Sequence, residues 1–419
     1  MKLRGAALAL LLTTQCMPPI RVSTAFASRF GDNDQTRLAR VLERLPRERT
    51  PRNQGLLAAV LQGDRREVAV YDIATHRPLW SQALAASGTP EIVGDALVVE
   101  TGHTTQLLDL QTGASRGQVE HTGLELTGAA RDGDRVVLCF SSGLAGGGRR
   151  SGRVVTLDAR SGGVRWEHEL SGLLGRPAAL GGLAFIPWDR QSIAVLDLAT
   201  GVEQARLRST DDVLSWVFAG DGGVWYGGRG LYHLTADSAS GTRQGSGLLV
   251  NPLQGVPGDP MLYQDGFLAT TGTRTARDHI RFGFLPRVGE HGRAALHDDA
   301  VYLAYYRHLL AVDVGQGTVR WAQRLEEDVE SLTVTARGVY VTSGTGKVRG
   351  VDPRTGAVSV VAELNAPLGA IAADFDALAA PSGGARPDGS VREQLVGLVL
   401  DADNLLVPFR GWLVGLLAM

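Results

Sequence analysis

The chain has 419 residues, with 42 basic and 44 acidic side chains and a formal net charge of −2. A charge this close to zero excludes a whole-molecule field that would attract nucleic acid or anionic membranes. The 54 glycines and two cysteines favour a fold rich in tight turns that disulfide bonds do not hold together.

Residues 1–27 have the features of an export signal. Lys2 and Arg4 precede a short apolar run, which is too short to span a bilayer. Two processing routes remain open: cleavage after Ala27, or lipid attachment at Cys16. Either route predicts an exported protein, located in the periplasm, on the periplasmic face of the outer membrane, or secreted. Only a lipid anchor would attach it to a membrane.

Residues 28–55 are expected to form a helix and a linker. Apolar residues recur at i, i+3, i+4 and i+7 from Leu38 to Leu45, and Pro46 follows. This spacing predicts a short amphipathic helix that ends before the proline. We expect the helix to lie on the main domain or to serve as a stalk, with a membrane-surface helix as the alternative.

From residue 56 onward, one phrase recurs with a period of roughly 40 residues, which is typical of propeller blades. Clear copies are LDARSGGVRW at 157–166 and VDVGQGTVRW at 312–321. An aspartate ends a strand, a glycine follows four residues later, and a tryptophan follows eight residues later in three copies. The residues of the pattern are Asp72, Asp109, Asp158, Asp197, Asp313 and Asp352; Gly113, Gly162, Gly201, Gly317 and Gly356; and Trp80, Trp166 and Trp321.

Each residue type in the phrase has a structural task. An aspartate carboxylate can accept hydrogen bonds from turn amides, and glycine can take the left-handed conformation that closes a hairpin. A tryptophan on the outermost strand can cover the neighbouring blade. We therefore interpret these residues as structural docking residues rather than ligand contacts.

The units resemble the tryptophan-docked repeats of the pyrroloquinoline-quinone-like β-propeller family, from residue 56 to about 364. The resemblance implies an all-β fold, an eight-bladed propeller of four-stranded antiparallel blades in a domain spanning 56–419. One unit is expected near residue 280. The first unit lacks a leading strand, so we expect the C-terminal segment 368–419 to complete the ring. Seven or nine blades are the alternatives.

The same resemblance raises the hypothesis of a dehydrogenase dependent on pyrroloquinoline quinone. The adjacent cysteines and acidic calcium site of such enzymes have no matching motif here, so we expect neither cofactor nor catalysis. His291, His297 and His308 lie within eighteen residues. Their surroundings favour a solvated hairpin over a metal site.

Candidate partner contacts are Arg149 and Arg150 in the loop 143–152, and Trp188, because arginine and tryptophan are common interface anchors. The export signal and repeat type resemble the BamB-like propeller lipoproteins of the outer-membrane β-barrel assembly machinery. This resemblance implies a monomeric, non-catalytic scaffold whose protein partners include the assembly barrel. A secreted or periplasmic propeller that binds a polysaccharide or other ligand is the alternative.

Overall fold

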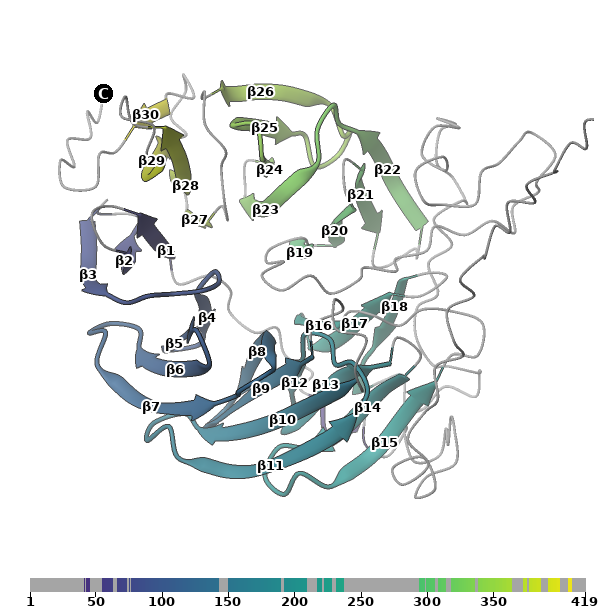
Figure 1. Cartoon of the computed structure of the whole chain (residues 1–419). Coiled ribbons are helices and arrows are strands. Elements are labelled where there is room, and N and C mark those ends of the chain that lie inside the picture. The colour runs from purple at the N-terminus through teal and green to yellow at the C-terminus, as the bar shows by residue number, and fades with distance from the viewer. Residues whose placement is uncertain are drawn as a thin grey trace, which may run out of the picture.

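The protein is an all-β propeller, in which antiparallel sheets follow one another around a central axis (Figure 1). The propeller class expected from the sequence is confirmed. The computed structural model describes residues 41, 43–45, 55–62, 66–73, 75, 77–142, 150–189, 192–208, 217–220, 222–227, 231–236, 294–297, 299–305, 308–313, 318–335, 338–363, 372–374, 377–385, 391–399 and 406–408.

Eight antiparallel sheets are present among the described residues, six of four strands and two of three. The first four, in chain order, are β1 (Leu56–Gln62), β2 (Arg66–Asp72), β3 (Arg77–Ala83); β4 (Glu91–Val93), β5 (Ala96–Thr101), β6 (Thr104–Asp109), β7 (Ser115–Glu120); β8 (Glu125–Asp132), β9 (Arg135–Ser141), β10 (Ser151–Asp158), β11 (Val164–Ser171); and β12 (Ala178–Leu180), β13 (Leu183–Trp188), β14 (Ser192–Asp197), β15 (Glu203–Arg208).

The other four sheets follow with the same hairpin order. They are β16 (Val217–Gly220), β17 (Gly223–Gly227), β18 (Leu231–Leu234); β19 (Ala294–His297), β20 (Ala300–Tyr305), β21 (His308–Asp313), β22 (Thr318–Arg324); β23 (Val329–Thr335), β24 (Gly338–Ser343), β25 (Lys347–Val351), β26 (Val358–Glu363); and β27 (Ala372–Asp374), β28 (Ala377–Ala385), β29 (Val391–Val399), β30 (Leu406–Pro408).

The first strand of each four-stranded sheet lies nearest the axis, and the fourth lies at the rim (Figure 1). Along the inner circle, β4 contacts β8, β8 contacts β12, and β19 contacts β23. Hairpins place the turns after the first and third strands at one end of the sheet. The turn after the second strand and the connection to the next sheet lie at the other end. The ring therefore has two distinct faces.

The sequence predicts that the C-terminal segment completes the ring, because the first unit lacks a leading strand. Strands β27–β30 form a sheet of their own, and they do not supply a strand to the sheet β1–β3. They lie beside that sheet, because β1 contacts β27, β28 and β29. The last sheet thus meets the first by packing, while the unit expected near residue 280 lies outside the described residues.

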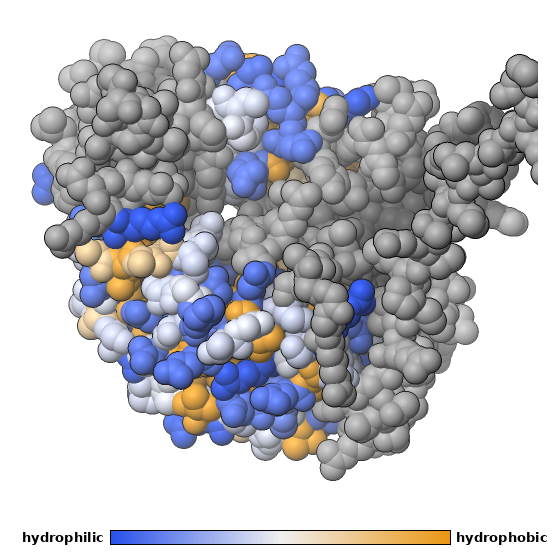
Figure 2. Space-filling model, in the orientation of Figure 1, coloured by the Kyte–Doolittle hydropathy of each residue, from blue (hydrophilic) through white to orange (hydrophobic). Residues whose placement is uncertain are grey.

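The hydrophobic core is divided among the spaces between neighbouring sheets. Val98 of β5 and Phe140 of β9 belong to one buried cluster, which fills the space between the second and third sheets. Large hydrophobic side chains that are exposed, such as Leu79 and Val164, lie singly on outer strands. On the described part of the face in Figure 2, hydrophobic residues alternate with hydrophilic ones. Scattered apolar residues of this kind are normal for a protein surface.

The N-terminal segment rests on the propeller where it is described. The chain is helical at Val41 and turns at 43–45, and Val41 and Leu45 are buried against the fourth and fifth sheets. The remaining residues of the expected helix, and the expected export signal with Cys16, lie outside the described residues. Within the part of the chain that the structure describes, no helix has the length and hydropathy of a membrane span.

Candidate interaction surface

An aspartate turn closes the third and fourth strands of each well-described sheet. In the second sheet, Asp109 Oδ1 accepts hydrogen bonds from Thr112 N at 2.8 Å and Thr112 Oγ1 at 2.9 Å. Gly113 N donates to the Asp109 carbonyl oxygen at 2.9 Å, with Gly113 at a φ of 73°. The same arrangement recurs at Asp158, Asp197 and Asp352. We call the face that these turns form the aspartate-turn face.

The ion pair with Arg116 holds the Asp109 carboxyl group in its charged form. Arg116 Nη2 lies 2.6 Å from Asp109 Oδ2. This hydrogen bond lowers the pKa of Asp109 to about 2, with help from Thr112 and against a smaller opposing effect of burial. The ordinary pKa of aspartate is about 3.9.

We expect the Asp109 turn to contribute stability that acid removes. A carboxyl group whose pKa falls on folding stabilises the fold above its unfolded pKa, and this contribution is lost as pH falls through the folded pKa. The urea midpoint of wild type should therefore exceed that of Asp109→Asn clearly at pH 5, and the gap should narrow towards pH 2. An equal gap at both pH values would contradict this assignment.

Tryptophans dock on the aspartate turn of the next sheet. Trp80 Nε1 donates to the carbonyl oxygen of Leu110, the residue after Asp109, at 2.8 Å. A Cβ atom on Gly113 would lie only 2.8 Å from Trp80 Cδ2, so the indole occupies the space that glycine leaves free. Trp166 docks on Leu198 and Gly201 in the same way, and Trp321 docks on Pro353 and Gly356.

A shift in strand register, as at a β-bulge, directs each tryptophan side chain towards the turn of the next sheet. The pairing register of β2 and β3 shifts between Val70 and Tyr71, and the residue paired just before the shift is Trp80. The same shift accompanies Trp166 and Trp321. Such bulges bend a strand and re-aim its side chains. The turn and the bulge together explain the fixed spacing from aspartate to tryptophan.

The junction between the second and third sheets uses different residues, which the sequence pattern did not reveal. Gly117 stands where three other copies have tryptophan, and a Cβ on Gly117 would lie 2.7 Å from Gly162 O. The two backbones therefore touch directly. Arg116 Nη1 donates to the carbonyl oxygen of Ala159 at 2.7 Å, the position that an indole N–H binds elsewhere. The signal for this role was an arginine seven residues after the aspartate.

The opposite face is formed by the segments that connect one sheet to the next, and we call it the connection face. Its described connections include 121–124, 172–177 and 325–328. The connection 172–177 is held in place, because Leu173 N donates to Asp189 Oδ1 at 2.9 Å and Leu174 N to Ser141 Oγ at 3.1 Å. A loop fixed in this way costs little ordering entropy when a partner binds.

Arg176 in that connection reaches two inner strands, β8 and β4. Its side chain crosses Gly128 of β8, where a Cβ would lie 2.5 Å from Arg176 Cγ. Its guanidinium lies 3.0 Å from the carboxylate of Glu91 in β4. The carboxylate is buried, while the arginine side chain keeps 35% of its surface exposed. Arg176 is therefore a rigidly held cation near the axis on the connection face.

Exposed charged side chains lie at two places on the connection face. Arg150 is exposed and lies beside Arg176's connection, since Gly172 N donates to Arg150 O at 3.1 Å. In the connection before β23 and at the start of that strand, Glu326, Asp328 and Glu330 are exposed. Opposite charges at separate places on one face can fix the orientation of a bound protein.

The three partner candidates from the sequence differ in their exposure to solvent. Arg150 is exposed, and Arg149 lies outside the described residues. Trp188 has only 1% of its surface exposed; its Nε1 donates to Ser171 O at 3.1 Å, and Arg206 lies over its ring at 4.5 Å. Trp188 thus packs beneath the connection face and supports it. Asp189, which follows, has a φ of 48° and holds the connection through Leu173.

Other candidate residues are only partly described. Asp313 ends β21, while Gly317 lies outside the described residues. His297 ends β19 and His308 begins β21, and His291 is likewise outside. Among the residues that the structure places, no group of three or more histidine, cysteine or acidic side chains could hold a metal ion.

A family model described as outer membrane protein assembly factor BamB matches residues 29–176, 104–238 and 266–384. The chain belongs to the BamB family. This membership confirms that the repeated sequence motif is that of the pyrroloquinoline-quinone-like β-propeller family. Among curated proteins, none matches this chain.

Solved structures of low identity share the fold. BamB from Moraxella catarrhalis is 19% identical, with a TM-score of 0.54, and the match covers 83% of this chain and 92% of that one. The dihydro-heme d1 dehydrogenase NirN is 16% identical, with a TM-score of 0.57 over 87% and 75% of the two chains. A europium-containing methanol dehydrogenase is 12% identical, with a TM-score of 0.50 over 83% and 81%. At such identities these likenesses concern the fold alone.

Proposed function

We propose that this protein is a non-catalytic, exported scaffold that binds protein partners during outer-membrane β-barrel assembly. The observation that carries the proposal is the family match, since its description names an assembly factor and its matched residues include most of the ring. A rigid ring presents loops at fixed positions, which suits a scaffold. We further propose that all eight sheets are blades of one closed ring and that the protein acts as a monomer.

The connection face is the surface we assign to the partner. The fixed connection 172–177, the cation Arg176 and the exposed Arg150 lie together there. Exposed Asp328 lies on the same face at the seventh sheet, beside Glu326, which is paired with Arg349 at 2.8 Å. A partner with complementary charges would meet both regions and bind in one orientation. The partner we propose is the periplasmic part of the assembly barrel.

Site-specific photo-crosslinking in cells tests this assignment. A photoreactive residue at Arg150 or Asp328 should yield a crosslink to the assembly barrel protein, identified by mass spectrometry. The matched control is Gln111, an exposed residue of an aspartate turn on the other face. Equal crosslinking from Gln111, or a barrel crosslink from neither Arg150 nor Asp328, would reject the proposed surface.

The same cells test export and attachment. We propose that the protein reaches the periplasm and is either lipidated at Cys16 or cleaved after Ala27. Cys16→Ser should release the protein from the membrane fraction if the lipid is its anchor. A soluble wild-type protein found outside the cell would favour the alternative, a secreted ligand-binding propeller.

A further inference from the structure

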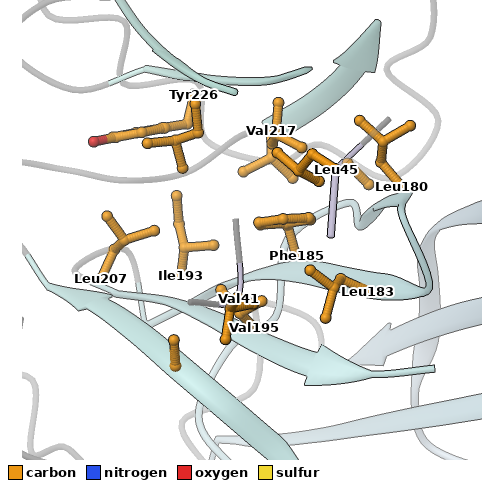
Figure 3. Packing of buried hydrophobic residues seen from close by; sticks show 14 of the residues in the cluster. Val41, Leu45, Leu180, Leu183, Phe185, Ile193, Val195, Leu207, Val217 and Tyr226 are labelled. Carbon is orange, nitrogen blue, oxygen red and sulfur yellow. The ribbon is translucent and has the colours of Figure 1, made fainter. Parts of the chain in front are cut away.

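The space between the fourth sheet, β12–β15, and the fifth, β16–β18, forms an apolar groove without a tryptophan plug. The residue eight positions after Asp197 is Ala205, so the outer strand β15 has no indole to dock on its neighbour. Buried residues from both sheets line the groove, among them Phe185, Val217 and Tyr226 (Figure 3).

The N-terminal segment fills this groove. Val41 and Leu45 are 6% and 3% exposed, and both belong to the buried cluster that joins the two sheets. Figure 3 shows them among Leu180, Phe185 and Val217. Two apolar side chains four residues apart on a helical turn point the same way. They cover apolar side chains of both sheets.

The polar end of the same segment binds the aspartate turn of the fourth sheet. Arg44 Nη1 lies 2.9 Å from Asp197 Oδ2, and Nη2 donates to the Gly182 carbonyl oxygen at 3.2 Å. Burial would raise the pKa of Asp197, but Arg44 and Thr200 hold it below its usual value. A Cβ on Gly181 would lie 2.5 Å from Arg44 O, so only glycine admits the segment there.

Arg44 takes a place that other sheets fill from their own outer strand. Arg116 and Arg165 each stand seven residues after an aspartate of the turn, and each pairs with that aspartate. The equivalent residue after Asp197 is Gln204, which carries no charge. The turn of the fourth sheet therefore obtains its cation from a segment 153 residues away.

We propose that the groove between the fourth and fifth sheets is a binding site for an apolar helical turn with one arginine, and that residues 41–45 of this chain are its built-in ligand. The docked segment fastens this junction, whose outer strand β15 carries no indole. The proposal does not depend on the proposed function.

Cutting the chain after it has folded tests the binding site in the full-length protein. A recognition sequence for a site-specific protease replaces residues 47–53, and the purified protein is cleaved and passed over a gel-filtration column at micromolar concentration. We expect the N-terminal fragment to co-elute with the ring. Release of the wild-type fragment under these conditions would overturn the proposal.

Single substitutions in the segment define which contacts hold it. Arg44→Glu places a second negative charge beside Asp197, so we expect the dissociation constant of the cleaved fragment to rise at least about tenfold. Glu43→Gln is the matched control, because Glu43 is exposed and neighbours Arg44; its fragment should be retained as in wild type. Retention of the Arg44→Glu fragment as strong as that of wild type would contradict the assigned contact.

Discussion

Trp321→Ala is expected to lower the free energy of unfolding by about 3–5 kcal/mol, the usual cost of truncating a buried tryptophan. The side chain is 4% exposed and lies in the cluster that joins the sixth and seventh sheets. Its loss would remove the apolar contact with Gly356 and leave the Pro353 carbonyl oxygen without its indole partner, now at 2.9 Å. Urea unfolding followed by circular dichroism measures the change.

Two further variants separate the causes of that loss. Trp321→Phe keeps an aromatic ring but cannot donate to Pro353 O, so it should cost about 1–3 kcal/mol. Val360 occupies the same repeat position in the next sheet and is 53% exposed. Val360→Ala should change stability by less than about 0.5 kcal/mol. A cost for Val360→Ala as large as for Trp321→Ala would mean that the repeat position alone, without docking, determines stability.

Gly356→Ala is expected to cost about 2–5 kcal/mol, although it adds a single methyl group. Gly356 has a φ of 73°, a conformation that costs a residue with a Cβ about 1–2 kcal/mol. The new Cβ would also lie 2.8 Å from Trp321 Cδ2, and such overpacking adds about 1–3 kcal/mol. The indole would have to move away from the turn.

Gly102→Ala is the matched control for this second substitution. Gly102 has a φ of 63°, but a Cβ there meets nothing within 4 Å. The control therefore measures the backbone cost alone, about 1–2 kcal/mol. If both alanine variants lost the same stability, the contact between indole and glycine would not be the reason for glycine at position 356.

The sequence predicted those parts of the fold that depend on residues close together in the chain and that recur in each repeat. The aspartate, the glycine four residues later and the tryptophan eight residues later belong to one hairpin, so their spacing reveals their roles. The sequence predicted that the C-terminal segment completes the ring, but it did not show with which strands the segment pairs, because strands can be recognised from local pattern but their partners cannot. The C-terminal strands pair among themselves and only pack beside β1.

Contacts between distant residues account for most of what the sequence did not reveal. Gly117 looked like a degenerate copy, yet it touches Gly162 of the next sheet. Arg44 and Asp197 are 153 residues apart, and no local pattern joins them. A comparison of the repeats could have shown that the Asp197 turn lacks an arginine of its own, since Arg116 and Arg165 share a position where the fourth sheet has Gln204. Trp188, considered as a surface contact, supports the connection face from beneath.

The claim that an indole docks on the turn glycine of the next sheet is tested most directly by a double-mutant cycle between Trp321 and Gly356. If the docking exists, Gly356→Ala should cost much less in the Trp321→Ala background, because only the backbone cost of about 1–2 kcal/mol remains there. The two substitutions would then be strongly non-additive. Additive losses, within about 0.5 kcal/mol, would contradict the account.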